Sequence, residues 1–251
     1  MLRHALPLLL CLLPALPAQI ALPSGGGQRF VDFSGDLAHP GALVVIGTLG
    51  KWKEGKRERL ADGQLGGGGQ VASVSGTQYF KVPVTAALQA RTTLHGKPEA
   101  VTLGFDVQLA RLPDGKERRQ VASGAALAED TLALFVVTPK AKKGHELRHV
   151  IVFDRTVDQG PDGEAAFGDT MRDYYTVNRR VHDLTEALAR LDRAKDEAGQ
   201  QAARTTLREL LAKPPELKRP ANDALLQQHV APLVQRAEKR LAGSPAEDAG
   251  K

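Results

Sequence analysis

The segment from Gly144 to Phe153 contains the pattern His-Glu-x-x-His, formed by His145, Glu146 and His149. On a helix, two histidines four residues apart lie one turn apart on the same face, and both imidazoles can reach one zinc ion. The glutamate then acts as a general base on a metal-bound water. A third ligand would have to come from downstream, where the candidates are Asp158, Glu164 and Asp169. The residue types and their spacing therefore allow zinc-dependent hydrolysis.

The local sequence instead favours a strand. Val150-Ile-Val-Phe153 places three β-branched residues and an aromatic in a row, which suits a pleated sheet better than a helix. Residues four apart on a strand share a face, but at ~3.3 Å per residue they lie ~13 Å from each other. Zinc–nitrogen bonds of ~2.0–2.1 Å cannot span that separation. The flanking basic residues would also repel a divalent cation: Lys140, Lys142, Lys143 and Arg148. We therefore predict a hairpin here.

From this reasoning we expect no catalytic residue, no bound metal and no cofactor. The alternative depends on the five residues that match the zincin metallopeptidases. That match implies zinc as the cofactor, His145 and His149 as its ligands with Glu164, and Glu146 as the general base.

The N-terminal residues indicate export. Arg3 gives a positive start, an apolar run follows to Leu16, and small residues lead to a predicted cleavage near Ala18. We expect residues 1–18 to be a signal peptide, and the mature chain to be periplasmic or secreted. The run is too short for a membrane helix of ~20 residues, and no later segment is apolar enough to be one. The only cysteine, Cys11, lies inside the predicted signal, so the mature chain would contain no disulfide.

Charge gives little indication of a partner. The chain has 34 basic and 29 acidic residues, a net charge of +5. Basic clusters at 51–59 and 140–143 lack the interleaved aromatic residues of a nucleic-acid stacking platform. We therefore expect no specific nucleic-acid binding. Trp52, which stands among the lysines, is expected to pack over the mouth of a barrel.

Residues 19–160 read as a β-barrel or sandwich domain. Ala42–Leu49 is a compact run of branched apolar residues and suits a central strand. Val101–Leu109 alternates apolar and polar residues, as a strand with one buried face does. Pro83 interrupts another alternating run, so we expect it at an edge or a bulge. Further strands are predicted at Thr131–Thr138 and Leu147–Phe153. Short strands joined by hairpin-length links are typical of a small antiparallel barrel or sandwich.

Residues 161–243 read as a region of about three helices. One apolar stripe predicts a helix over 164–195 that packs against the neighbouring parts of the same chain. The residues of the stripe recur at steps of three, four or seven: Phe167, Met171, Tyr174, Val181, Leu184, Leu188 and Leu191. A second helix is expected from Gln200 to Ala212, before two prolines. A third is expected from Asn222, as N-cap, to Leu241, with a kink at Pro232. Residues 244–251 are expected to form a disordered tail. The fold class is therefore α+β.

The order of four β segments, Ala42–Leu49, Tyr79–Val84, Leu94–Pro98 and Leu134–Val137, resembles exported OB-type barrels of the netrin and tissue-inhibitor sort. The resemblance covers residues ~40–155. Those modules are rich in cysteine and this chain is not, so only the barrel shape is carried over. In such barrels the loops and one face bind a partner. We therefore expect an exported, non-enzymatic binding or interaction module with an unknown macromolecular partner in the cell envelope.

Overall fold

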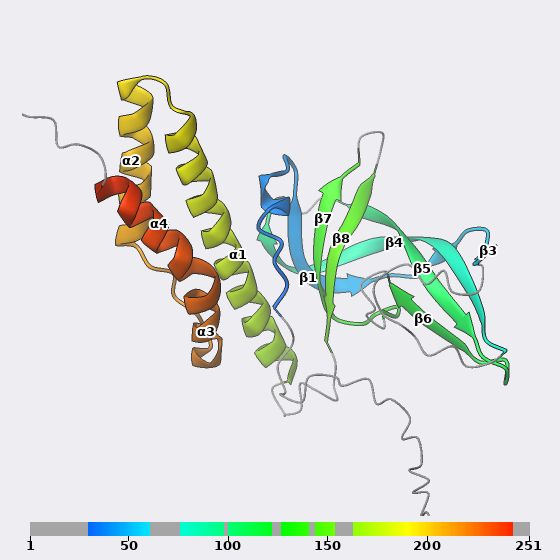
Figure 1. Ribbon diagram of the computed structural model, residues 1–251. Coiled ribbons are helices and arrows are strands. Elements are labelled where there is room, and N and C mark those ends of the chain that lie inside the picture. Colours follow the sequence, from blue (N-terminus) through cyan, green and yellow to red (C-terminus); the bar gives the residue numbers. More distant parts are fainter. Residues whose placement is uncertain are drawn as a thin grey trace, which may run out of the picture.

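The computed structural model describes residues 30–60, 76–97, 100–121, 127–140, 144–153 and 163–242, with the side chains of 119–121 left aside. The protein is an α+β structure: a β-barrel in the N-terminal part and a helical region after it (Figure 1). The predicted signal peptide at 1–18 and the predicted tail at 244–251 lie outside the described residues.

Within the described part of the chain, eight strands form one mixed sheet. They are β1 (Leu43–Leu49), β2 (Lys53–Glu54), β3 (Glu58–Arg59), β4 (Gln78–His95), β5 (Val101–Arg111), β6 (Glu117–Val121), β7 (Ala133–Pro139) and β8 (His145–Val152). Five of them close a ring in the order β1-β4-β5-β8-β7, and β7 returns to β1. All neighbours in the ring are antiparallel except β5 and β8, which are parallel and pair at only two positions.

The compact apolar runs form strands that are buried on both faces. In β1, Val45 and Leu49 point into the barrel, whereas Val44 and Ile46 belong to a second core outside it. β7 is divided in the same way, with Phe135 inside the barrel and Val136 outside. A strand covered on both sides needs apolar side chains at every position, which is why these two segments do not alternate.

Pro83 lies where its proline ring costs no ladder bond. In β4 it is opposite Asp106 of β5, while the strand on its other side is broken between β2 and β3. The Gly55 N–H at that break donates to the Pro83 carbonyl oxygen, 2.8 Å away. Pro83 therefore lies at a local edge on one side of β4, while the other side of the strand pairs with β5 without a bulge.

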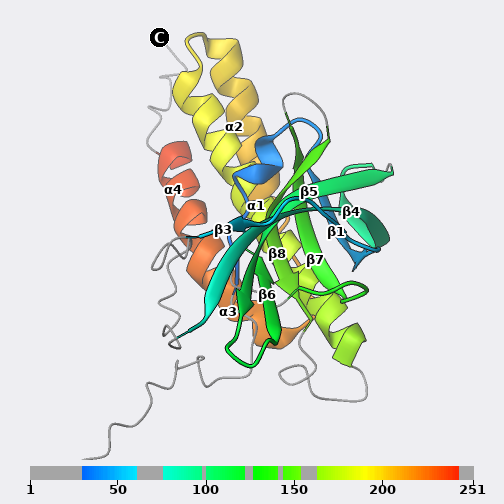
Figure 2. The same ribbon diagram turned by 90° about the vertical axis from the view of Figure 1, so that its right-hand side faces the viewer.

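Helix α1 (Gly163–Arg193) joins the barrel to the helical region. Its first half packs Phe167, Met171 and Tyr174 on the outer faces of β1 and β7. Its second half packs Leu184 and Leu188 against the other helices. The predicted stripe is therefore confirmed, and it serves two cores in succession. Figure 1 shows the helices on one side of the barrel, and Figure 2, turned by 90°, shows the barrel in front with the helices behind it.

The remaining helices correct the predicted boundaries. Helix α2 (Glu197–Ala212) begins earlier than expected because the Asp196 carboxylate caps it, accepting from the Gly199 N–H at 2.7 Å. The third predicted helix is divided into η2 (Pro220–Asn222), α3 (Asp223–Leu225), a π-helical segment η3 (Leu226–Val230) and α4 (Ala231–Ala242). Asn222 does not cap with its side chain, which instead donates to Asp173. The π-helical turns lie directly before Pro232, whose ring would clash with the carbonyl four residues earlier in a regular α-helix.

Candidate functional site

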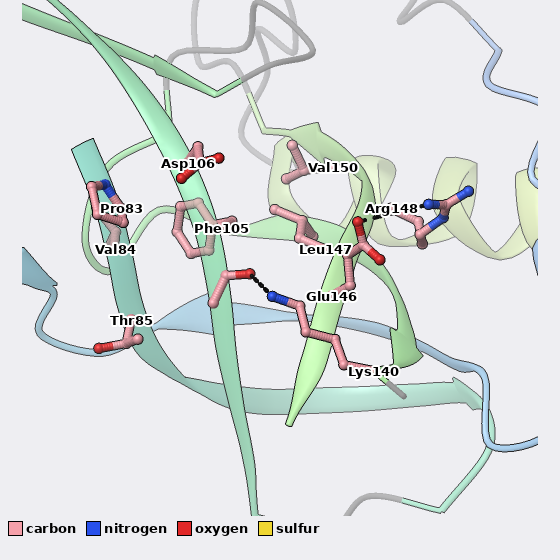
Figure 3. A pocket seen from close by; sticks show the side chains of 11 residues that line it. Pro83, Val84, Thr85, Phe105, Asp106, Lys140, Glu146, Leu147, Arg148 and Val150 are labelled. Atoms are coloured by element: carbon pink, nitrogen blue, oxygen red, sulfur yellow. Dashed lines mark hydrogen bonds and ion pairs between the residues drawn. The ribbon is translucent and has the colours of Figure 1, made fainter. Parts of the chain in front are cut away.

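A hollow of about 400 Å³ opens in the barrel wall where β5 and β8 part (Figure 3). Its size is within the range of small-ligand pockets, ~300–1,000 Å³. Its lining is half apolar, from Pro83, Val84, Phe105, Leu147 and Val150. The other residues are Thr85, Gly104, Asp106, Lys140, Glu146 and Arg148. The hollow therefore combines apolar surface with charged groups, as binding sites commonly do.

The hollow exists because β5 and β8 stay together for only two residues. Leu103 pairs with His145 and Gly104 with Glu146, after which the strands diverge. A β-bulge then bends β8: His149 is opposite Val136 and Leu147 is opposite Val137, so Arg148 is the extra residue. The bend leaves the apolar side chains beyond Gly104 and Glu146 without a strand between them.

The apolar floor of the hollow is the edge of the barrel core. Phe105 of β5 and Leu147 of β8 face each other across it (Figure 3), and both pack against the buried cluster inside the ring. Trp52 supports Phe105 with an edge-to-face contact, 5.7 Å between ring centroids and 88° between planes. Trp52 packs against the barrel core, and its expected position over the barrel mouth stays a prediction.

Charged side chains surround this floor. The Lys140 ammonium, at the end where β5 and β8 meet, donates to the Gly104 carbonyl oxygen at 3.3 Å. Asp106 pairs with Lys81 at 2.9 Å, and Glu146 lies 3.8 Å from the Arg148 guanidinium. Among the described residues, no carboxylate lies within ion-pair distance of Lys140. The Lys140 ammonium, at the end of the hollow where β5 and β8 meet, is therefore available to an anionic group.

The residues of the His-Glu-x-x-His pattern lie on β8, as the hairpin prediction required. The His149 ring contacts the Asp36 carboxylate at 2.9 Å, and Arg148 donates to the other oxygen of Asp36 at 3.0 Å. The bulge makes this possible because it turns two successive side chains towards η1 (Asp36–Ala38), the short turn that carries Asp36. His145 and Glu146 lie at the other end of β8, so the extended backbone does not gather the two imidazoles.

The proposed third ligands are also dispersed. Glu164 pairs with Arg91 at 3.2 Å, and Asp169 pairs with Arg172 at 2.8 Å. Asp158 lies outside the described residues. Within the ranges that the structure describes, no group of three His, Cys, Asp or Glu side chains is placed to hold a metal ion.

A second group of titratable side chains lies between the end of β4 and α1. The Tyr175 hydroxyl lies 3.4 Å from Nδ1 of His95, and Arg179 pairs with Asp183 at 3.0 Å. Partial burial lowers the pKa of His95, and the electrostatic effects of Arg179 and His182 lower it further. Burial also raises the pKa of the Tyr175 hydroxyl. Burial of His95 and the neighbouring Arg179 therefore favour the neutral form of this imidazole, where the barrel meets the helix.

Sequence reasoning did not identify the hollow or the partner of His149. Lys140 was recognised only as part of a basic cluster, although its place directly after a strand-ending proline could have marked it as a rim residue. Asp36 carries no sequence signal for this role, because it lies more than a hundred residues from His149 and forms no motif.

In comparisons with known proteins, no family model, no curated protein and no solved structure matched this chain. Among the described helices, none has both the length and the apolar character needed to cross a membrane.

Proposed function

We propose that this chain is an exported, non-enzymatic binding module, and that the hollow between β5 and β8 is its binding site. The observation that carries the proposal is the hollow itself: apolar residues of the barrel core are accessible there, beside a lysine without a carboxylate partner among the described residues. Exposed apolar surface of this kind, bordered by polar and charged residues, commonly marks a place where a partner binds.

The position of the hollow supports an OB-like assignment. OB barrels are small five-stranded Greek-key barrels that bind ligands on the face of their second and third strands and with the loop between the fourth and fifth. In chain order, the second and third strands of the ring are β4 and β5, and Lys140 begins the link from β7 to β8. All three contribute to the hollow. We propose that the site is used as in other barrels of this shape, with a cell-envelope macromolecule as the partner.

Binding of the mature protein to a washed cell-envelope fraction tests this function. Lys140→Glu reverses the charge at the hollow, and Lys239→Glu makes the same change on the exposed surface of α4. We expect saturable binding that Lys140→Glu weakens about tenfold or more and that Lys239→Glu leaves unchanged. Binding that is equally weakened by both variants would reflect net charge alone and would remove the hollow from the proposal. N-terminal sequencing of the secreted or periplasmic protein tests the proposed cleavage near Ala18.

The alternative function, a zinc-dependent hydrolase, requires β8 to change conformation so that His145 and His149 meet. Its test is metal content after incubation of the mature protein with excess zinc. About one zinc per chain, lost in His149→Ala, would support the hydrolase, and no retained zinc would remove it.

A further inference from the structure

We propose that the ligand of the hollow is the C-terminal end of an extended polypeptide, which adds a strand beside β8 and places its terminal carboxylate at Lys140. This inference rests on the proposed binding function and names the chemical class of its ligand.

The first observation is the pairing of β8. On one edge β8 pairs with β7 along its length, from His145 to Val152. On the other edge its only ladder partner among the described strands is β5, at His145 and Glu146. Beyond that pairing, Leu147, Arg148 and Val150 of β8 line the hollow. Strand edges of this kind pair readily with an added chain, and peptide recognition by strand addition uses their backbone N–H and C=O groups.

The second observation is the shape of the gap. β5 and β8 are parallel and meet at Gly104 and Glu146, so the opening narrows to a closed end there. An inserted chain cannot continue past that end, because β5 and β8 are already paired beyond it. A chain terminus, and not the middle of a loop, therefore fits the narrow end.

The third observation fixes which terminus. A strand that runs antiparallel to β8 also runs antiparallel to β5, since those two are parallel, and antiparallel pairing is the more stable arrangement. Such a strand enters beside Ile151 and ends beside Glu146, with its C-terminus at the closed end. Lys140 lies there, with its ammonium against the Gly104 carbonyl. An ammonium attracts a terminal carboxylate and repels a terminal amine, so charge and strand direction agree.

The side chains of the hollow predict the pattern of the peptide. On an added strand, alternate side chains would point towards Phe105 and Leu147, while the others would point to solvent. We expect alternate apolar residues in the last five or so positions, over the length of β8 that faces the hollow.

A pool of random hexapeptides with free C-termini, and the same pool amidated at the C-terminus, are the probes. Each pool is passed over immobilised mature full-length protein, and the retained peptides are identified by mass spectrometry. We expect the free-acid pool to give alternating apolar peptides whose affinity falls about tenfold or more on amidation. In Lys140→Met, which keeps the apolar stem and removes the charge, that difference should vanish. Lys239→Met, on the exposed face of α4, is the matched control and should preserve it.

N-methylation of single backbone amides in a retained peptide tests the strand pairing. Loss of binding at every second amide supports a strand paired with β8 alone, and loss at every amide supports a strand paired with both β8 and β5. Loss at none of the amides overturns the strand pairing. Retention without preference for the free carboxylate, or no retained peptide, also overturns the inference. If envelope binding in that case still depends on Lys140, the proposed binding function stands and only the ligand class is wrong.

Discussion

Replacement of Asn178 by alanine should strongly destabilise the contact between the N-terminal segment and α1. Asn178 is fully buried, and its Oδ1 accepts from the Phe33 N–H at 2.7 Å. Its Nδ2 donates to the carbonyl oxygens of Val31, at 3.1 Å, and Tyr174, at 2.9 Å. One side chain thus pairs with both a donor and an acceptor of the incoming chain, as a neighbouring strand would.

The magnitude follows from what the substitution leaves behind. Phe33 is 1% exposed, so its N–H would lose its partner in a place that water does not reach, at a cost of ~1–3 kcal/mol. The carbonyl of Val31 is in a partly exposed residue, and that of Tyr174 lies within a helix, so together they add about 1 kcal/mol. We expect Asn178→Ala to reduce the free energy of unfolding by about 2–4 kcal/mol, a large part of the ~5–15 kcal/mol typical of domains.

Urea unfolding of the purified protein, followed by circular dichroism and by tryptophan fluorescence, measures this loss. Gln201→Ala, on the exposed face of α2, is the control and should change stability by less than ~0.5 kcal/mol. Coincident transitions from both probes are needed before the values are compared. A loss below ~0.5 kcal/mol for Asn178→Ala would show that the segment at 30–33 is held by other contacts, and the reasoning would be wrong.

Three further predictions concern backbone contact, pH and a buried carboxylate. A Cβ added at Gly47 would lie 2.2 Å from the Gln89 carbonyl oxygen, so Gly47→Ala should reduce the free energy of unfolding by at least ~2 kcal/mol. Gly35→Ala is the control: its added Cβ would have nothing within 4 Å, and it should reduce stability by less than ~0.5 kcal/mol in the same unfolding assay. Because the pKa of His95 is lowered in the folded state, the unfolded chain binds its proton more readily, and stability should be fully present above the ordinary histidine pKa of ~6.5 and decrease as the pH falls below it. His95→Gln should make stability less dependent on pH in this range. An equal dependence of stability on pH in both proteins would contradict the assignment of this effect to His95. Asp173 is 1% exposed and accepts from the backbone N–H groups of Lys218, at 2.6 Å, and Arg219, at 3.0 Å. Asp173→Asn turns one acceptor into a donor and should reduce the free energy of unfolding by ~2 kcal/mol or more. A smaller reduction would show that the 218–219 turn can rearrange.

The sequence predicted the elements whose burial is periodic. The run at Ala42–Leu49, the alternation at Val101–Leu109 and the stripe along α1 each report which faces are covered, and each was recognised. β6 was missed because Glu117–Val121 is mostly charged, as an edge strand can be when one side faces water. The π-helical turn before Pro232 was anticipated only as a kink, since proline signals a disturbed ladder and not the form that the disturbance takes.

The closure of the ring and the hollow could not be predicted in the same way. Pairing between β5 and β8 joins residues more than forty positions apart, and nothing in either segment specifies where the two strands separate. The buried amide of Asn178 carries no periodic signal either, because a single polar residue in an apolar stripe can equally be a packing defect or a surface residue. For the His-Glu-x-x-His pattern, the propensity of Val150–Phe153 for strand was informative, and the resemblance to netrin-type modules stays a prediction.

The sharing of α1 between two cores restricts how this protein can be shortened. The outer faces of β1 and β7 are covered by Phe167, Met171 and Tyr174 from the same helix that the other helices pack against further along. A fragment that stops after β8 would leave Val44, Ile46, Leu134 and Val136 in contact with water, on two neighbouring strands. Such a fragment should be prone to self-association through this exposed apolar surface. Experiments on the barrel therefore need a chain that continues at least through the first half of α1.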